Sequence, residues 1–86
     1  MPRALSIKRS IVPLADRTKY LERLKGRKDH YKRAGCDFWV FEEAALTGAF
    51  IEFVEAADAA VLEAAHAAAP EPVLDPARIY TEVELT

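Results

Sequence analysis

Apolar and polar residues alternate along the first stretch of the chain, residues 4–12. One set of alternate positions is aliphatic and the other is polar, namely Leu5, Ile7 and Ile11 against Ser6, Lys8 and Ser10. A period of two residues is typical of a β-strand that is buried on one face only. Pro13 follows and ends the strand, because proline has no amide proton to donate to a sheet.

Two stretches have the pattern of a helix. The first, residues 17–34, follows Asp16 as an N-cap and precedes Gly35, which suits the left-handed position after a helix. The second, residues 59–69, follows Asp58 as its N-cap. The predicted inward stripes are Tyr20, Leu21, Leu24, Tyr31 and Ala34 in the first helix, and Val61, Leu62, Ala65 and Ala69 in the second.

Three further stretches have the character of strands. Residues 38–43 and 49–55 are rich in aromatic and β-branched side chains, and the turn at 46–48 joins them in a hairpin. Residues 79–85 alternate again. The connection at 70–76 is rich in proline, so neither a helix nor a central strand can contain it.

The predicted order of elements is therefore β-α-β-β-α-β. Right-handed crossovers leave one main arrangement for this order, the split βαβ or ferredoxin-like fold of the α+β class. Four antiparallel strands form its sheet, the first and third strands lie in the centre, and both helices cover one face. The other face is left without cover.

We expect the uniformly aliphatic side of the strands to meet the helices. The residues concerned are Leu5, Ile7, Ile11, Ile51, Phe53, Ile79, Val83 and Leu85. The uncovered side is then predicted to carry Ser6, Lys8, Ser10, Trp39, Phe41, Phe50, Glu52, Val54, Tyr80, Glu82 and Glu84. Its four aromatic rings make an apolar patch of roughly 600 Å². A patch of that size is at the upper limit for a monomer, so we expect a second copy of the chain to cover it.

Composition supports a partner subunit. The 86 residues suffice for a single domain, placed at residues 1–86, whose own core is marginal. Cys36 is the single cysteine, so an internal disulfide is excluded. The sequence starts without a signal-peptide pattern and has no run of about 18 apolar residues, so we expect a cytoplasmic protein that does not enter a membrane.

Charge is distributed unevenly along the chain. Residues 1–35 carry eleven Lys and Arg against three acids, while residues 36–86 carry one Arg against eleven acids. A basic segment can bind nucleic acid, but such sites also use aromatic side chains that stack on bases. Only Tyr20 and Tyr31 lie in the basic segment. We therefore expect the positive charges of residues 1–35 and the negative charges of residues 36–86 to screen each other. We expect no nucleic-acid partner.

A charged cluster is the first candidate site. Lys8 on a central strand is predicted to lie between Glu52 and Glu82 on the uncovered face. A lysine held between carboxylates is able to anchor a polar ligand group or to take part in proton transfer. The alternative, which we favour, is a ladder of salt bridges that fixes the strand register or a dimer contact.

Aromatic side chains are the second candidate site. They are able to form the walls of a pocket for a flat apolar molecule, or equally the core of an interface: Trp39, Phe41, Phe50 and Tyr80. His66 lies three residues after Glu63, which is able to orient it as a general base. The alternative for His66, which we favour, is partial exposure or packing at a helix end.

A metal site is not expected. His30 lies among charged residues and is expected on the surface, and Cys36 after the first helix is expected to be an inert apolar residue. A trio of His30, Cys36 and His66 has no ligand spacing typical of metal sites. We expect no metal and no cofactor.

The order of elements and the aromatic middle strands, Phe38-Trp39-Val40-Phe41 and Phe50-Ile51-Glu52-Phe53, resemble the dimeric α+β barrel superfamily over residues 4–85. That superfamily includes antibiotic-biosynthesis-type monooxygenases and haem-degrading enzymes. The resemblance implies a homodimer with ligands held at the sheet face. The haem-degrading members use an asparagine, a residue type that this chain lacks, so their activity and cofactor are not implied.

Three functions follow as hypotheses. The first is a homodimer that binds a small apolar or aromatic ligand in the cleft on the uncovered face. The second is a cofactor-independent monooxygenase or isomerase with Glu52 or His66 as its base. The third is a structural interaction module with no ligand.

Overall fold

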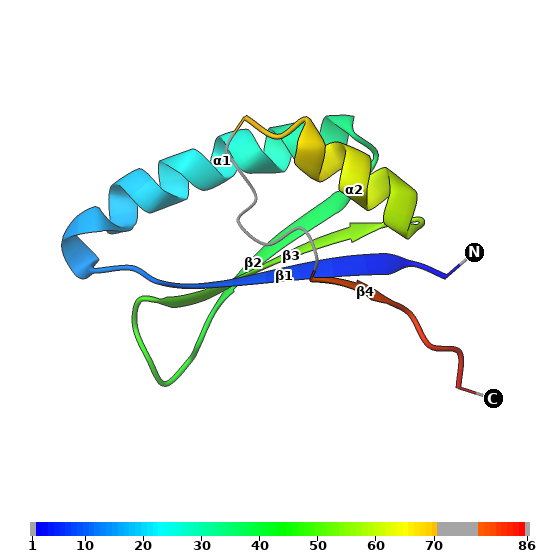
Figure 1. The fold of residues 1–86 in the computed structure, drawn as a ribbon. Helices are drawn as coiled ribbons and strands as arrows, with labels where there is room; N and C mark the ends of the chain where they lie inside the picture. Colours follow the sequence, from blue (N-terminus) through cyan, green and yellow to red (C-terminus); the bar gives the residue numbers. More distant parts are fainter. Residues whose placement is uncertain (1, 71–77, 86) are drawn as a thin grey trace.

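The computed structural model describes residues 2–70 and 78–85. Its elements are β1 (Ala4–Ile11), the 3₁₀ helix η1 (Leu14–Asp16), α1 (Arg17–Arg33), β2 (Asp37–Glu42), β3 (Ala49–Ala56), α2 (Ala59–Ala67) and β4 (Ile79–Thr81). The strands form an antiparallel sheet in the order β2-β3-β1-β4. Both described helices lie on one side of the sheet, and no described element covers the other side (Figure 1). The predicted ferredoxin-like α+β fold is confirmed.

The helices begin close to the predicted residues. Asp58 caps α2 as expected, since its Oδ1 accepts a hydrogen bond of 2.9 Å from the amide of Val61. Asp16 precedes α1, but its side chain makes no capping hydrogen bond, and the chain enters α1 directly from η1. Gly35 follows α1 with a φ of +81°, a conformation that glycine adopts without strain.

The loop between β2 and β3, residues 43–48, descends on the side of the sheet away from the helices (Figure 1). Gly48 closes it with a φ of +91°, and an added Cβ would lie 2.5 Å from the carbonyl oxygen of Val12, so the turn requires glycine. Glu42 pairs with Arg17 at 2.6 Å and accepts a hydrogen bond of 2.9 Å from the amide of Gly48. These two contacts, chiefly the one with Arg17, lower the pKa of Glu42 to about 2. The loop is therefore tied to the start of α1.

On the two central strands, β1 and β3, the side that meets the helices is the opposite of the predicted one. The helix-facing residues of the central strands are Ala4, Ser6, Lys8 and Ser10 on β1, and Phe50, Glu52, Val54 and Ala56 on β3. The buried core consists of Ala4, Tyr31, Cys36, Val54, Ala56, Leu62 and Ala65. The prediction that Leu5, Ile7, Ile11, Ile51 and Phe53 meet the helices was wrong. The prediction for the uncovered face was equally wrong for Ser6, Lys8, Ser10, Phe50, Glu52 and Val54.

Polar partners on the helices account for this reversal. The side chain of Ser6 is 3.0 Å from His66 of α2, and the carboxylate of Glu52 is 3.0 Å from Arg27 of α1. A polar group beneath a helix is tolerated when it finds such a partner. The aliphatic side chains of β1 need no partner of this kind, so they are the ones left on the other side.

The last strand is shorter than predicted. It ends at Thr81, and the following Val83 and Leu85 are 74% and 92% exposed instead of meeting the helices. Ile79 does pack against the core, as expected. The proline-rich connection falls outside the described residues between positions 71 and 77.

Candidate functional site

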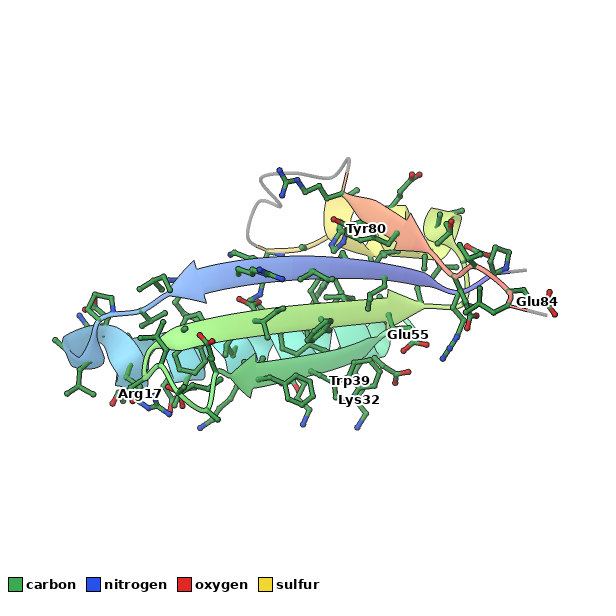
Figure 2. The ribbon with its side chains drawn as sticks, turned by 90° about the horizontal axis from the view of Figure 1, so that it is seen from below. Arg17, Lys32, Trp39, Glu55, Tyr80 and Glu84 are labelled. Carbon is green, nitrogen blue, oxygen red and sulfur yellow. The ribbon has the colours of Figure 1, made fainter. Side chains whose placement is uncertain are left out.

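The side of the sheet away from the helices, here called the open face, is apolar in its centre. Its members are Leu5, Ile7, Arg9 and Ile11 on β1, Asp37, Trp39 and Phe41 on β2, Ala49, Ile51, Phe53 and Glu55 on β3, and Tyr80 on β4. Phe53 is the central residue, since Ile7 lies opposite it on one side and Trp39 on the other. Figure 2 looks onto this face, with Trp39 and Tyr80 on the two edge strands.

Much of this apolar surface is accessible to solvent. The largest exposed fractions belong to Trp39 (43%), Phe41 (56%), Tyr80 (53%) and Ile11 (77%). Phe41 and Phe53 contact each other edge to face, with ring centroids 5.6 Å apart. Together with the half-buried Leu5, Ile7, Ile51 and Phe53, these residues expose roughly 600 Å² of apolar surface, the upper end for a monomer. The predicted placement of Trp39, Phe41 and Tyr80 on this face is confirmed.

A groove of about 570 Å³ lies at one end of the open face, beneath the loop that joins β2 and β3. We call it the hairpin groove, and it is lined by Arg9, Ser10, Ile11, Phe41, Glu42, Glu43, Leu46, Ala49, Phe50 and Ile51. Its apolar walls come from β1, β2 and β3 and from the loop. The charged residues of its lining are Arg9, Glu42 and Glu43, of which Glu42 is paired with Arg17. Such a groove provides apolar contacts for the body of a ligand and charged side chains for a polar group on it.

The predicted cluster of Lys8, Glu52 and Glu82 does not form. Lys8 is opposite Glu52 in the sheet, but its side chain is exposed and makes no ion pair with another described residue. Glu82 follows the end of β4 and pairs with Arg3 at 2.8 Å. The hydrogen bonds and charge of Arg3 lower the pKa of Glu82. The three charges are therefore in three separate environments.

Glu52 lies in the layer between sheet and helices and is 1% exposed. Its Oε2 accepts a hydrogen bond of 3.0 Å from the hydroxyl of Tyr20, and its Oε1 is 3.0 Å from Nε of Arg27 as an ion pair without hydrogen-bond alignment. Burial first, and then the negative charge of Glu52, raise the pKa of Tyr20. Both carboxylate oxygens are thus engaged by α1, which leaves neither available to a substrate.

His66 is a buried residue of α2, and both of its ring nitrogens have a hydrogen-bond partner. Its Nδ1 is 2.8 Å from the hydroxyl of Tyr31, and its Nε2 is 3.0 Å from that of Ser6. Burial, followed by the positive charges of Arg27 and His30, lowers the pKa of His66. The neutral ring donates from one nitrogen and accepts at the other. His66 therefore packs in the core, and Tyr31 and Ser6 hold its ring in place of the predicted Glu63.

The other predicted site residues also have structural surroundings. His30 is half-buried, with Nε2 2.8 Å from the carbonyl oxygen of Ala65, and so differs from the predicted solvated residue. Cys36 is buried, and this burial is the main cause of the raised pKa of its thiol. Within residues 2–70 and 78–85, no three potential metal-ligating side chains come together.

Sequence reasoning missed the role of Arg27 and of the hairpin groove. Arg27 lies seven residues after Tyr20 and four before Tyr31, so all three share one face of α1. That spacing, together with the need of a buried Glu52 for a positive partner, is a signal in the sequence for the pair of Arg27 and Glu52. The groove has no such signal, because Leu46 and Arg9 meet there only through the course of the hairpin loop.

Comparison with known proteins gives no relative. No family model matches the chain, and no curated protein or solved structure matches it at a significant level. Neither helix in the described part of the chain has the length and apolar character needed to cross a bilayer. The open face and its groove are therefore the features that bear on function.

The buried position of His66 predicts a dependence of stability on pH. Because its folded pKa is lowered from 6.5, the unfolded chain binds the proton more readily. The stabilisation by His66 is complete above the unfolded pKa and is lost as pH falls through the folded pKa. We expect the free energy of unfolding of a His66→Gln variant, measured by urea titration at a series of pH values, not to show this fall in acid. A His30→Gln variant is expected to show it like the wild type. An unchanged loss in His66→Gln contradicts the assignment.

The contrast between Glu52 and Lys8 predicts unequal effects of removing their charges. Glu52→Gln is expected to lower the free energy of unfolding by about 3 kcal/mol, because the guanidinium of Arg27 stays buried without the carboxylate of Glu52. Lys8→Met is expected to change it by less than about 0.5 kcal/mol, since Lys8 is exposed. Urea unfolding followed by circular dichroism measures both. Equal destabilisation by the two variants is the result that this structure does not allow.

Proposed function

We propose that the protein is a homodimer whose two open faces pack together, and that the hairpin groove of each subunit binds a small apolar or aromatic ligand. The observation that carries this proposal is the apolar surface around Phe53, Trp39 and Phe41, which the fold leaves without cover. The groove continues this surface towards the hairpin loop.

A second copy is the cover that suits the surface best. Covering roughly 600 Å² of apolar area contributes about 15 kcal/mol from each subunit, against association costs of about 4–15 kcal/mol. The area approaches the about 800 Å² per partner of a standard interface. Two sheets packed face to face also agree with the dimeric α+β barrel superfamily, which the chain resembles in its order of elements.

The groove is suited to a small ligand in size and chemistry. Its volume of about 570 Å³ lies within the range of about 300–1,000 Å³ for small-molecule sites. Ile11, Phe41 and Leu46 provide apolar contacts, and Arg9 provides a positive charge for a carboxylate or carbonyl at one end of a ligand. We therefore propose an apolar or aromatic molecule with a single polar end.

Binding is favoured over catalysis. Neither of the predicted bases, Glu52 and His66, is among the residues that line the groove. Both are engaged by side chains of the core. A monooxygenase or isomerase that uses them as bases is therefore the less favoured proposal, and they are assigned to the support of the fold.

Dimerisation through the open face predicts that one charge at its centre separates the subunits. Phe53→Glu, and likewise Ile7→Glu, is expected to raise the dimer Kd by about 100-fold or more, because a carboxylate becomes buried in apolar surroundings. Sedimentation measures the association. The single tryptophan, Trp39, reports it independently, since its emission shifts to the blue when its exposed ring is covered.

Leu21→Glu is the matched control. Leu21 is 38% exposed on α1, on the far side of the sheet from the open face. This variant is expected to dimerise like the wild type. A wild-type protein that remains monomeric at high concentration, with Trp39 emission independent of concentration, overturns the proposed dimer.

Ligand binding in the hairpin groove predicts a loss when the groove is filled. Ala49→Phe places a ring among the lining residues and is expected to weaken binding of the probe anilinonaphthalene sulfonate by about 10-fold or more. Ala60→Phe on the exposed side of α2 adds the same ring elsewhere and is expected to leave binding unchanged. Fluorescence titration at concentrations where the protein is dimeric measures both. Equal binding by the two variants places the probe outside the groove.

A further inference from the structure

Two exposed charges on the open face form no ion pair with any residue in the part of the subunit that the structure describes. Arg9 on β1 and Asp37 on β2 are both exposed, and neither makes an ion pair with another described residue. The other charged side chains at the acidic end of the face are paired: Arg3 contacts Glu55 and Glu82, each at 2.8 Å. If the open face is covered, Arg9 and Asp37 lose water and need partners from the covering surface.

Their positions are related by the register of the sheet. Arg9 lies opposite Ile51 of β3, and Asp37 lies opposite Glu55 of the same strand. Because β3 runs between β1 and β2, the two charges occupy diagonally opposite corners of the apolar patch. Phe53, halfway between Ile51 and Glu55, marks the centre of that diagonal.

From this placement we infer that the two subunits pack about a two-fold axis that lies in the plane of the interface. The axis passes by Phe53 and is perpendicular to the diagonal from Arg9 to Asp37. Arg9 of each subunit then pairs with Asp37 of its partner. The inference rests on the proposed dimer and adds its orientation. A two-fold interface is self-complementary, so a single such contact occurs twice. Opposite charges at corresponding positions fix the orientation of such an interface.

The two simpler orientations leave both charges without partners. An axis parallel to the strands through β3 places Arg9 against the partner's Phe41, and Asp37 against the partner's Leu5. An axis across the strands through Phe53 places Arg9 against Leu5, and Asp37 against Phe41. Both arrangements bury two charges per subunit against apolar side chains, which is costly. The axis perpendicular to the diagonal avoids the burial of Arg9 and the burial of Asp37 without a partner at the same time.

The diagonal arrangement also brings the partner to the ligand site. Arg9 lines the hairpin groove, so Asp37 of the partner subunit lies at the wall of that groove. Glu55 is the neighbour of Asp37 across the strands and adds negative charge beside the same contact. The positive potential that a ligand meets in the groove therefore depends on Arg9 and on the negative charge that the partner subunit places beside it.

Charge reversal tests the inferred pairing. Arg9→Glu sets two acids against each other and Asp37→Arg sets two bases against each other, so each variant alone is expected to raise the dimer Kd by about 100-fold. In a mixture of the two variants, both contacts of the heterodimer join opposite charges. Sedimentation of the mixture is therefore expected to recover dimers, and the double variant Arg9→Glu/Asp37→Arg is expected to dimerise alone.

Lys8→Glu is the control, because it reverses a neighbouring exposed charge on the helix side of β1. It is expected to leave the Kd unchanged. A dimer that tolerates Arg9→Glu, or a mixture that fails to recover dimers, overturns the diagonal pairing while the dimer itself stands. A monomeric wild type overturns the dimer and the pairing together. Circular dichroism of each variant confirms that the fold is retained.

Discussion

The contact between Glu52 and Arg27 is the interaction on which the arrangement of the layers depends. A buried carboxylate is costly without a partner, and α1 provides one at 3.0 Å on the side of the sheet that Glu52 occupies. Because adjacent residues of a strand point to opposite faces, fixing Glu52 towards the helices also fixes its neighbours Ile51 and Phe53 away from them. The position of one carboxylate therefore determines the chemistry of both faces.

The rest of the molecule follows from this choice of sides. The space beneath the helices is partly polar, with the rings of Tyr31 and His66 and the hydroxyl of Ser6 joined in one chain of contacts. The open face receives the aliphatic and aromatic side chains that usually fill a core. Because the apolar side chains lie on the uncovered side of the sheet, the open face is a candidate for an interface and the adjoining groove a candidate for a ligand site.

The fold was largely predictable, whereas the sides of its sheet were not. The period-two patterns of β1 and β3, the helical patterns, the cap at Asp58 and the glycine turn at Gly48 are local signals, and each is found close to where the sequence places it. The pattern at 79–85 is the exception, because β4 ends at Thr81. The facing of β1 was wrongly predicted because alternation shows only that its two sides differ. Which side a helix covers depends on the partners that the helix brings, and Arg27 is distant from β1 and β3 in the sequence.

The sequence by itself determined the number and order of the strands and α-helices, because hydrogen bonding along the backbone and side-chain period are local properties. Only the tertiary structure decided that Glu52 and His66 are held by side chains of the core while Ile7 and Phe53 lie on the open face. It also decided that Lys8 and Glu82 lie apart, since the register of β4 on β1 places Glu82 beside Arg3. The physical reason is that burial and pairing of a polar group depend on residues brought together by folding, which no local pattern records.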